Sequence, residues 1–343
     1  MSSLPYLNLA GYFAKYGVLL TVFTNSLLIH LTWYHVKNIT PAYKCLILLM
    51  AVLGIVFSMV EIIVHPFMHS YNSSCMYFSV TLSSLNHSVG IALLTLYSLM
   101  YTLIICCLAI QFIYRSFVVL SPRSLKWFHG RRISIWVCYG VICSASWLAA
   151  IYQTLPDEYS QHYLTQEFAV NYDTDLYFVP SYHLVAFDEK GSVRMKNLIG
   201  VFGLASVLSS QYIVMIYCGI QIHSGMDHSA TMRSGKLHRL QKQLFNTLLL
   251  QLVVPSIFYN TPVLLMYIAP YLNLKLSFPS GVMICFFSLY PATDSLILMS
   301  MVTEYYMVLQ KLLVKLIEYL KNWASNVAAG SSAEDTSSGE ENY

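Results

Sequence analysis

The sequence predicts an all-α membrane protein, a bundle of seven transmembrane helices with the N-terminus outside, the C-terminus inside and a short amphipathic helix after the last span. Of its 343 residues, 57% are apolar and 10% are charged, whereas an ordinary soluble domain carries about 25% charged residues. Four long stretches contain no Asp, Glu, Lys or Arg: 62–114, 133–156, 197–226 and 243–274. No soluble core can bury so much apolar chain, so the composition excludes a soluble enzyme, a nucleic-acid-binding protein and a disulfide-stapled secreted module.

Seven windows of the chain are long enough to cross a membrane. A helix needs roughly 20 residues, at about 1.5 Å each, to span the hydrocarbon layer. The uncharged stretch 62–114 is too long for one helix, and Pro66 with the small polar residues after it divides the stretch in two. The predicted spans are about 11–34, 43–64, 89–114, 133–151, 197–222, 244–267 and 281–303.

The basic residues predict which side each loop faces. With the N-terminus outside, 14 of the 19 Lys and Arg residues fall in the three inner loops or just after the seventh span. Cytoplasmic loops collect Lys and Arg, so this orientation is the expected one. No secretory signal peptide is recognisable before the first span, which is therefore expected to act as its own insertion signal.

The predicted outer side carries two N-glycosylation sequons, at Asn72 and Asn86, and both are expected to be available for a glycan. A third sequon, at Asn38, falls on the inner side. Of the eight cysteines, Cys75 alone falls in an outer segment. The sequence therefore predicts no outer disulfide, and the cysteine and histidine spacing predicts no metal site.

The predicted receptor domain comprises residues 1–303, and two further segments follow it. Apolar residues recur at helical spacing over 304–323, with Lys311, Lys315 and Glu318 on the other face. This pattern is typical of an amphipathic helix lying on the inner membrane surface. An extension of the seventh helix is the alternative. Residues 324–343 are small, polar and acidic, and are expected to be disordered.

Ionisable side chains within a span cost about 2.5–3.5 kcal/mol or more, so each is a candidate functional residue. Glu61 lies near the outer end of span two, and His65 follows one helical turn later on the same face. The pair is the candidate ligand pocket. A purely structural role near the membrane edge is an equally open interpretation.

A second group of residues is expected to switch or hold the helices. Asp294, in the inner half of span seven, is expected to latch helices in one state. Asn25 and Gln251 can hydrogen-bond between helices, with simple packing as the plainer alternative. Pro255 in span six and Pro291 in span seven each remove a helix hydrogen bond and allow a kink.

The loop 152–196 is unusually long and rich in tyrosine. A loop of that length is uncommon without a function, so it is expected to form a lid over an outer pocket or to anchor at the interface. HExxH, GxSxG, Walker A and GxGxxG motifs are absent from the sequence, and span seven has no lysine to carry retinal. The sequence therefore predicts neither an enzyme nor a cofactor.

Several blocks of residues resemble one known family. The longest, residues 237–272, reads LHRLQKQLFNTLLLQLVVPSIFYNTPVLLMYIAPYL. This block is similar to span six of the str class of nematode seven-transmembrane chemoreceptors. The blocks FSMVE at 57–61, HPFMH at 65–69, FIYR at 112–115 and YPATD at 290–294 also match the family pattern. The resemblance covers essentially the whole chain except the tail.

The resemblance implies a chemosensory receptor in the plasma membrane of sensory cilia, which binds a small, volatile molecule and activates a heterotrimeric G protein. Two departures stand out: Ser295 replaces a second proline that relatives often have, and Arg115 lacks the preceding acid of rhodopsin-like receptors. On physical grounds alone, the role of a positive-inside membrane anchor is the favoured one for Arg115. The expected G-protein face is Arg115, Arg131, Arg132, Arg239 and Lys242.

The alternative function is a seven-span ligand-gated cation channel of the odorant-receptor type. Such a channel needs the opposite orientation, with the N-terminus inside, and the distribution of basic residues argues against it. A transporter is less well supported, because the sequence shows no paired repeat and no span interrupted by glycines.

Overall fold

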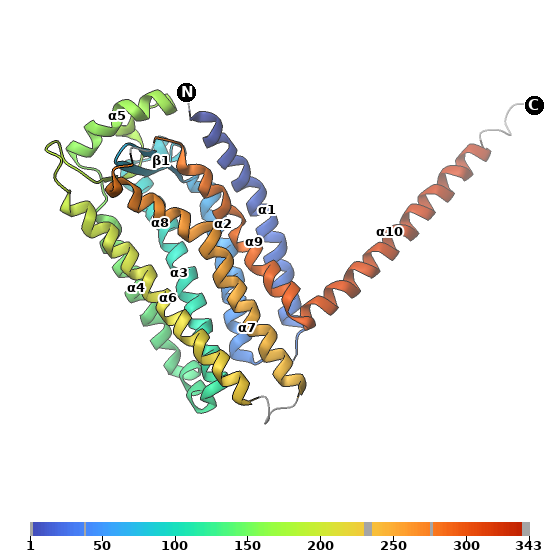
Figure 1. Cartoon of the computed structure of the whole chain (residues 1–343). Helices are drawn as coiled ribbons and strands as arrows, with labels where there is room; N and C mark the ends of the chain where they lie inside the picture. Colours follow the sequence, from blue (N-terminus) through green and yellow to red (C-terminus); the bar gives the residue numbers. More distant parts are fainter. Residues whose placement is uncertain (1–2, 38, 230–234, 275–276, 338–343) are drawn as a thin grey trace, which may run out of the picture.

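The computed structural model describes residues 3–37, 39–229, 235–274 and 277–337. Seven helical segments in this part of the chain are long and apolar enough to cross a membrane, which confirms the predicted bundle (Figure 1). The helices that form them are α1 (Leu4–Tyr34), α2 (Pro41–Val64), α3 (His87–Leu120), α4 (Ser134–Tyr152), α6 (Met195–Ser229), α7 (Gly235–Pro255) with α8 (Thr261–Ile268), and α9 (Ile284–Met301).

Local chemistry sets several of the helix ends. Asn86 caps α3, because its side-chain oxygen accepts a hydrogen bond of 3.0 Å from the backbone N–H of Ser88. Helix α2 ends at His65, whose φ of 45° is left-handed, and the following Pro66 cannot continue a helix. Helices α1 and α9 approach each other closely at Gly17. A Cβ atom added there would lie 2.7 Å from the carbonyl oxygen of Ser288, so the close contact requires glycine.

A small sheet covers one end of the bundle and was not predicted (Figure 1). Strands β1 (Phe67–Tyr71), β2 (Ser74–Phe78) and β3 (Ser181–Val185) pair antiparallel in the order β1-β2-β3. Asn72, with φ of 47°, makes the turn between β1 and β2. We name this end the sheet end. The opposite end, with residues 35–37, 39–40 and 121–133, is named the basic end.

The predicted loop 152–196 has its own secondary structure. It contains α5 (Glu158–Tyr172) as well as β3. Asp157 caps α5: its carboxylate accepts from the backbone N–H of Ser160 at 2.9 Å, while the Ser160 hydroxyl accepts from the backbone N–H of Asp157 at 3.0 Å. Helix α5 lies over the sheet end, beside the N-terminus of α1 (Figure 1). We name the segment 152–196 the lid.

The sixth span contains a π-helical turn. Residues Ser256–Asn260 form this turn, called η5, between α7 and α8. Pro255 directly precedes it and has no N–H to donate to the helix ladder. A π-turn inserts one extra residue and rotates the following side chains about the helix axis. The expected irregularity at Pro255 is thus a change of helix type.

Helix α10 (Thr303–Ser337) leaves the basic end and points away from the bundle (Figure 1). Its first turns pack on the bundle through Tyr305, which is buried. Leu313 and Ile317, further along the helix, are exposed. The helix includes the expected amphipathic segment 304–323 and continues into the segment expected to be disordered. Residues 338–343 of that segment lie outside the described part.

Candidate functional site

An apolar cavity lies under the sheet, between the helices, and we name it the sheet-end cavity. Its volume is about 80 Å³. One water needs about 10–15 Å³, so the space suits a small organic molecule. It is lined by Met68 and Tyr77 from the sheet, Tyr97, Ser98 and Tyr101 from α3, Trp147 from α4, Val201, Leu204, Ala205 and Leu208 from α6, Asn260, Val263, Leu264 and Tyr267 from span six, and Ile284 and Phe287 from α9.

The π-turn places a polar hub at this cavity. The Tyr101 hydroxyl on α3 donates a hydrogen bond to Oδ1 of Asn260, and the Asn260 amide donates to the Tyr212 hydroxyl on α6. The Tyr212 hydroxyl also lies 3.0 Å from the Ser256 hydroxyl. Asn260 lines both the sheet-end cavity and a smaller cavity below it. Three spans therefore meet at one amide beside the cavity.

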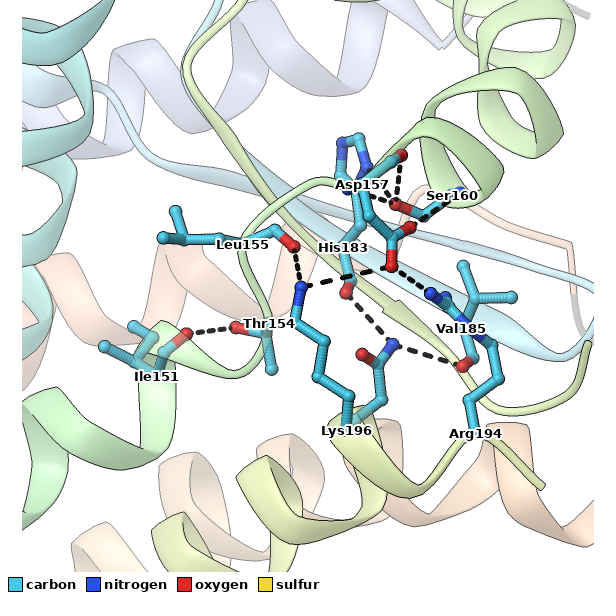
Figure 2. A network of polar contacts seen from close by, with 10 residues as sticks. Ile151, Thr154, Leu155, Asp157, Ser160, His183, Val185, Arg194 and Lys196 are labelled. Carbon is cyan, nitrogen blue, oxygen red and sulfur yellow. Dashed lines mark hydrogen bonds and ion pairs between the residues drawn. The ribbon is translucent and has the colours of Figure 1, made fainter.

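A polar network fastens the lid to the helices (Figure 2). At its centre the Asp157 carboxylate pairs with the Arg194 guanidinium and lies 3.9 Å from the Lys196 ammonium. Partial burial raises the pKa of Asp157, but the hydrogen bonds from Ser160 and the two cations outweigh it and leave the pKa below its usual value. Lys196 also donates to the Leu155 carbonyl at 3.1 Å.

The same network holds β3 in place. The Asn197 side-chain amide on α6 donates to the carbonyls of His183 and Val185, at 3.2 and 3.1 Å (Figure 2). His183 is buried, with Nε2 2.9 Å from the Ser181 hydroxyl. Burial disfavours the charged imidazolium and lowers the pKa of His183 to about 3. The lid is therefore built around a neutral histidine.

A second network ties the N-terminus to the lid. His69 on β1 is buried, with Nδ1 2.9 Å from the Tyr172 hydroxyl and Nε2 3.2 Å from the Glu167 carboxylate. Burial lowers the pKa of His69, although the Glu167 carboxylate opposes the shift. Further along α5, Asn171 accepts a hydrogen bond of 2.8 Å from the Ser3 hydroxyl. Strand β1, α5 and the start of α1 are thus joined by side-chain hydrogen bonds.

Glu61 and His65, the predicted pocket pair, line a different space, which we name the side cavity. It has a volume of about 300 Å³ and is bounded mainly by α1 and the end of α2. Glu61 is buried, and its Oε1 accepts a hydrogen bond of 2.6 Å from the Ser288 hydroxyl on α9. Lys15 lines the same cavity, and Ile284 borders both cavities. The structure thus brings the pair together outside the sheet-end cavity.

The predicted switch residues meet in two pairs. Asn25 donates to the carbonyl of Pro291 at 3.3 Å, and its Oδ1 accepts a hydrogen bond of 2.6 Å from the Ser295 hydroxyl. The departure from the family pattern at Ser295 thus contributes a helix–helix contact. Gln251 on α7 donates to the Asp294 carbonyl on α9 at 3.5 Å. Four of the five predicted switch residues therefore lie where α9 contacts α1 or α7, and the fifth, Pro255, precedes the π-turn of span six.

Arg115 lies inside the basic end. Its side chain is buried, with the guanidinium carbon 3.9 Å from the centre of the Tyr43 ring. Its Nη1 donates a hydrogen bond of 2.7 Å to Oε1 of Gln241 on α7. In this arrangement Arg115 joins spans three and six. The other expected G-protein-face residues are exposed: Arg131, Arg132, Arg239 and Lys242.

Sequence reasoning missed the hub and the cavity walls. Asn260 lies in span six and is as polar as Asn25 and Gln251, so it offered the same signal as they did. Its contact with Tyr101 depends on the π-turn. The sequons at Asn72 and Asn86 both lie at the sheet end, at the β1–β2 turn and at the start of α3. The eight cysteines, all in the described part of the chain, are free.

The comparisons with known proteins agree on one family. The sequence pattern of the family described as "Serpentine type 7TM GPCR chemoreceptor Str" matches residues 10–310. The chain is 39% identical over 308 residues to "G-protein coupled receptor str-33" of Caenorhabditis elegans. The aligned residues cover 87% of this chain and 89% of that protein. It is 28% identical over 296 residues to "Serpentine receptor class r-10" of the same species, over 84% and 86% of the two chains.

The fold is similar to that of a solved receptor. The crystal structure of squid rhodopsin superimposes with a TM-score of 0.55, covering 91% of this chain and 81% of that chain, at 13% sequence identity. At this identity the likeness concerns the fold alone. The comparisons confirm the family and the seven-helix receptor fold that the sequence predicted.

Proposed function

Because this chain belongs to the Str family of serpentine seven-transmembrane G-protein-coupled chemoreceptors, we propose that its ligand binds in the sheet-end cavity and acts on the G protein at the basic end. The protein is a multi-pass membrane receptor of chemosensory type. The observation that carries the proposal is the convergence of five spans and the sheet on one apolar cavity whose wall includes the hub at Asn260.

The cavity is a better ligand site than the side cavity for three reasons. Its walls are almost wholly apolar and aromatic, as in most small-molecule sites. Spans three to seven all contact it, so a ligand there has differential contacts with any rearrangement of those helices. The Glu61 carboxyl in the side cavity is already engaged by Ser288, which favours a structural role for Glu61.

The proposed mechanism is a population shift. A ligand that fits one arrangement of the bundle better than another shifts the equilibrium by its difference in affinity and by no more. Asn260 joins the cavity wall to α3, α6 and span six. When a ligand changes the hydrogen bonds of Asn260, the angle between α7 and α8 changes. The position of α7 beside Arg115 then changes as well. Release of the Arg115–Gln241 bond is the proposed step that opens the basic end to the G protein.

The orientation follows from the charges at the two ends. We propose that the sheet end faces the outside and the basic end the cytoplasm, because Lys and Arg gather in cytoplasmic loops. Residence in the ciliary membrane of sensory neurons is part of the same proposal. Epitope tags at both termini in intact cells test the orientation. An accessible N-terminal tag, a protected C-terminal tag and a glycan at Asn72 or Asn86 are expected, and the reverse accessibility would overturn the assignment.

A cavity-filling substitution tests the ligand site. Ala205 lines the cavity on α6, and Ala205→Phe places a ring in the ligand space. Ala145 on α4 is exposed, and Ala145→Phe is the matched control. In cells with a G-protein reporter, a panel of small ketones, esters, alcohols and hydrocarbons is applied to each variant at equal surface level. The Ala205 variant should lose the response and the Ala145 variant keep it. An intact response in the Ala205 variant places the ligand elsewhere.

A further inference from the structure

A third cavity lies between the lid and the sheet end, and we name it the lid groove. Its volume is about 290 Å³. It is lined by Ser73 from the β1–β2 turn, Tyr159 and Tyr163 from α5, Val185, Phe187, Asp188 and Gly191 from β3 and the residues after it, and Asn273 after span six. Gly191 and Asn273 are exposed. Three segments that are far apart in the sequence therefore share one space that solvent reaches.

The walls of the lid groove combine aromatic rings with polar groups. Tyr159 and Tyr163 stack, with ring centroids 6.1 Å apart. Oδ1 of Asn273 accepts a hydrogen bond of 2.9 Å from the Ser73 hydroxyl, and its amide nitrogen is a donor. Oδ1 of Asp188 accepts from two backbone N–H groups, which leaves Oδ2 as an acceptor. A molecule with hydroxyl groups, which both donate and accept, and with apolar carbon faces between them fits such walls.

The acceptor of the first sequon, Asn72, borders the lid groove. Its side chain hydrogen-bonds to the Tyr163 hydroxyl. Both neighbours of Asn72 contact the same space: the Tyr71 ring lies 5.9 Å from the Tyr163 ring, and Ser73 lines the groove. The backbone N–H of Asn72 donates a hydrogen bond of 3.3 Å to the Ser277 hydroxyl, which helps to fix the turn. A sugar joined to the Asn72 amide therefore begins beside the wall of the groove.

The second sequon has different surroundings. Asn86 is exposed and caps α3. Among the described residues, those that line the lid groove do not include Asn86. A glycan on Asn86 therefore extends from the start of a helix without a groove beside it. The chain thus offers a matched pair of sites, with the same modification at the same end of the bundle.

We propose that the lid groove holds the first sugar of an N-linked glycan on Asn72, and that this sugar joins the lid to the β1–β2 turn and to the end of span six. The inference rests on the proposed orientation, because the sheet end must face the outside to receive a glycan. The first sugar is an N-acetylglucosamine. Its C1 bonds to Nδ2 of Asn72, which loses one proton, and the lipid diphosphate that carried the glycan leaves.

The attachment makes even weak contacts effective. A covalently linked sugar meets the groove at a high effective concentration, so its binding costs little association entropy. The groove exists only while the lid lies on the turn, because its walls come from both. A sugar that binds this arrangement stabilises it against opening of the lid. The glycan on Asn72 should therefore protect α5, and the glycan on Asn86 should not.

The test measures hydrogen exchange of the α5 amides in the purified receptor in nanodiscs. Receptor from cells that attach only high-mannose glycans is compared intact, after endoglycosidase H, which leaves one sugar on each asparagine, and after production with N-glycosylation blocked. The intact and trimmed forms should exchange alike. The glycan-free form should exchange about two- to ten-fold faster, as the loss of about one net hydrogen bond implies. Loss of protection on trimming, or equal exchange in all three forms, would overturn the inference.

Two matched substitutions assign the effect to one site. Asn72→Asp and Asn86→Asp each remove a glycan, and Asp tolerates the left-handed turn at 72 and the cap position at 86. The glycan-dependent difference in exchange is compared within each protein, so any effect of the substitution itself cancels. The difference should vanish in Asn72→Asp and persist in Asn86→Asp. The opposite result would refute the role of the Asn72 glycan.

A third pair of variants tests the groove. Tyr163→Ala removes a wall and keeps both sequons, and Tyr177→Ala removes a lid tyrosine that is 71% exposed and lies outside the groove. The glycan-dependent difference should vanish in the first and persist in the second; persistence in both, or loss in both, would show that the sugar does not bind in the groove. A glycan on Asn86 but not on Asn72 overturns this inference alone. Receptor without a glycan at either site would overturn the orientation as well.

Discussion

Nη1 of Arg115, on α3, donates a hydrogen bond of 2.7 Å to Oε1 of Gln241, on α7, while the guanidinium stacks on the Tyr43 ring. Two spans that are far apart in the sequence are thereby joined at the basic end. Hydrogen bonds to a charged group contribute about 1.5–3 kcal/mol. Such a bond is strong enough to bias a two-state bundle by roughly ten- to a hundred-fold.

Removing the acceptor of this bond should raise ligand-independent signalling. In Gln241→Ala, Arg115 loses its partner on α7, so the arrangement with spans three and six together is less favoured. Basal G-protein activation in a reporter assay should rise several-fold at equal surface level. Gln310→Ala, on the exposed face of α10, is the control and should leave it unchanged. An unchanged basal signal in the Gln241 variant means that the bond does not hold an inactive state.

The hub at Asn260 should behave as one unit with Tyr101. Asn260→Ala leaves the Tyr101 hydroxyl without its acceptor, and Tyr101→Phe leaves the Asn260 oxygen without its donor. Each single variant should lower the free energy of unfolding by about 1–3 kcal/mol. The double variant should lose clearly less free energy of unfolding than the sum of the two single losses, because the effects of substitutions at groups in contact are not additive. Thermal unfolding in nanodiscs measures the cycle, and strictly additive costs would show that the two groups act independently.

Acid should loosen the lid through His183. The folded-state pKa of about 3 is below the usual value of 6.5, so the unfolded lid binds the proton more readily. The stability that the lid gains by keeping His183 neutral is complete above pH 6.5. It is lost as the pH falls toward 3, by about 1.4 kcal/mol per pH unit. Nearby Asp157 favours the charged ring and Arg194 opposes it.

The measurement is hydrogen exchange of the β3 amides between pH 7 and pH 5, corrected for the intrinsic rates. Protection should decrease on acidification in the wild type. In His183→Gln, which keeps polar atoms near Ser181 and Ser160, the decrease should be smaller. His69 shifts in the same direction, so some pH dependence should remain. Equal decreases in the two proteins would exclude His183 as its source.

Glu61 should prove to be a helix–helix contact that the ligand does not touch. Glu61→Gln keeps an oxygen that can accept the hydrogen bond from the Ser288 hydroxyl. The amount of receptor at the cell surface and its sensitivity to ligand should therefore stay within about two-fold of the wild type. Glu61→Leu leaves the Ser288 hydroxyl without its acceptor and should reduce the surface level. Dose–response curves with a surface tag measure both. A large loss of sensitivity in Glu61→Gln, at normal surface level, would move the ligand into the side cavity.

The spans could be predicted from the sequence because the membrane penalises charge so heavily that uncharged stretches of 20 residues stand out. The sheet could not. Strands β1 and β2 are five residues each and lie in a segment marked as a loop by Pro66 and small polar residues. The partner strand β3 is about 100 residues further along the chain, and single-sequence patterns carry no information about such pairing.

The site residues divide in the same way. Glu61 and His65 share one helix face, so their common cavity follows from helical periodicity. Asn25, Pro291 and Asp294 are conspicuous one by one, but their contacts depend on how α1 and span six pack against α9. Asn260 faces Tyr101 through a π-turn, which shifts the helical register by one residue. The sequence before the turn does not specify that shift.

The central claim is that a ligand in the sheet-end cavity drives a G protein at the basic end. The most direct measurement is nucleotide exchange on a purified heterotrimeric G protein by the receptor in nanodiscs, with and without the panel compound that evokes the largest response in cells. This compound should accelerate exchange in the wild type and in Ala145→Phe, and leave it at the basal rate in Ala205→Phe. A compound that binds and evokes a cation current in planar bilayers, without any acceleration of exchange, would contradict the account.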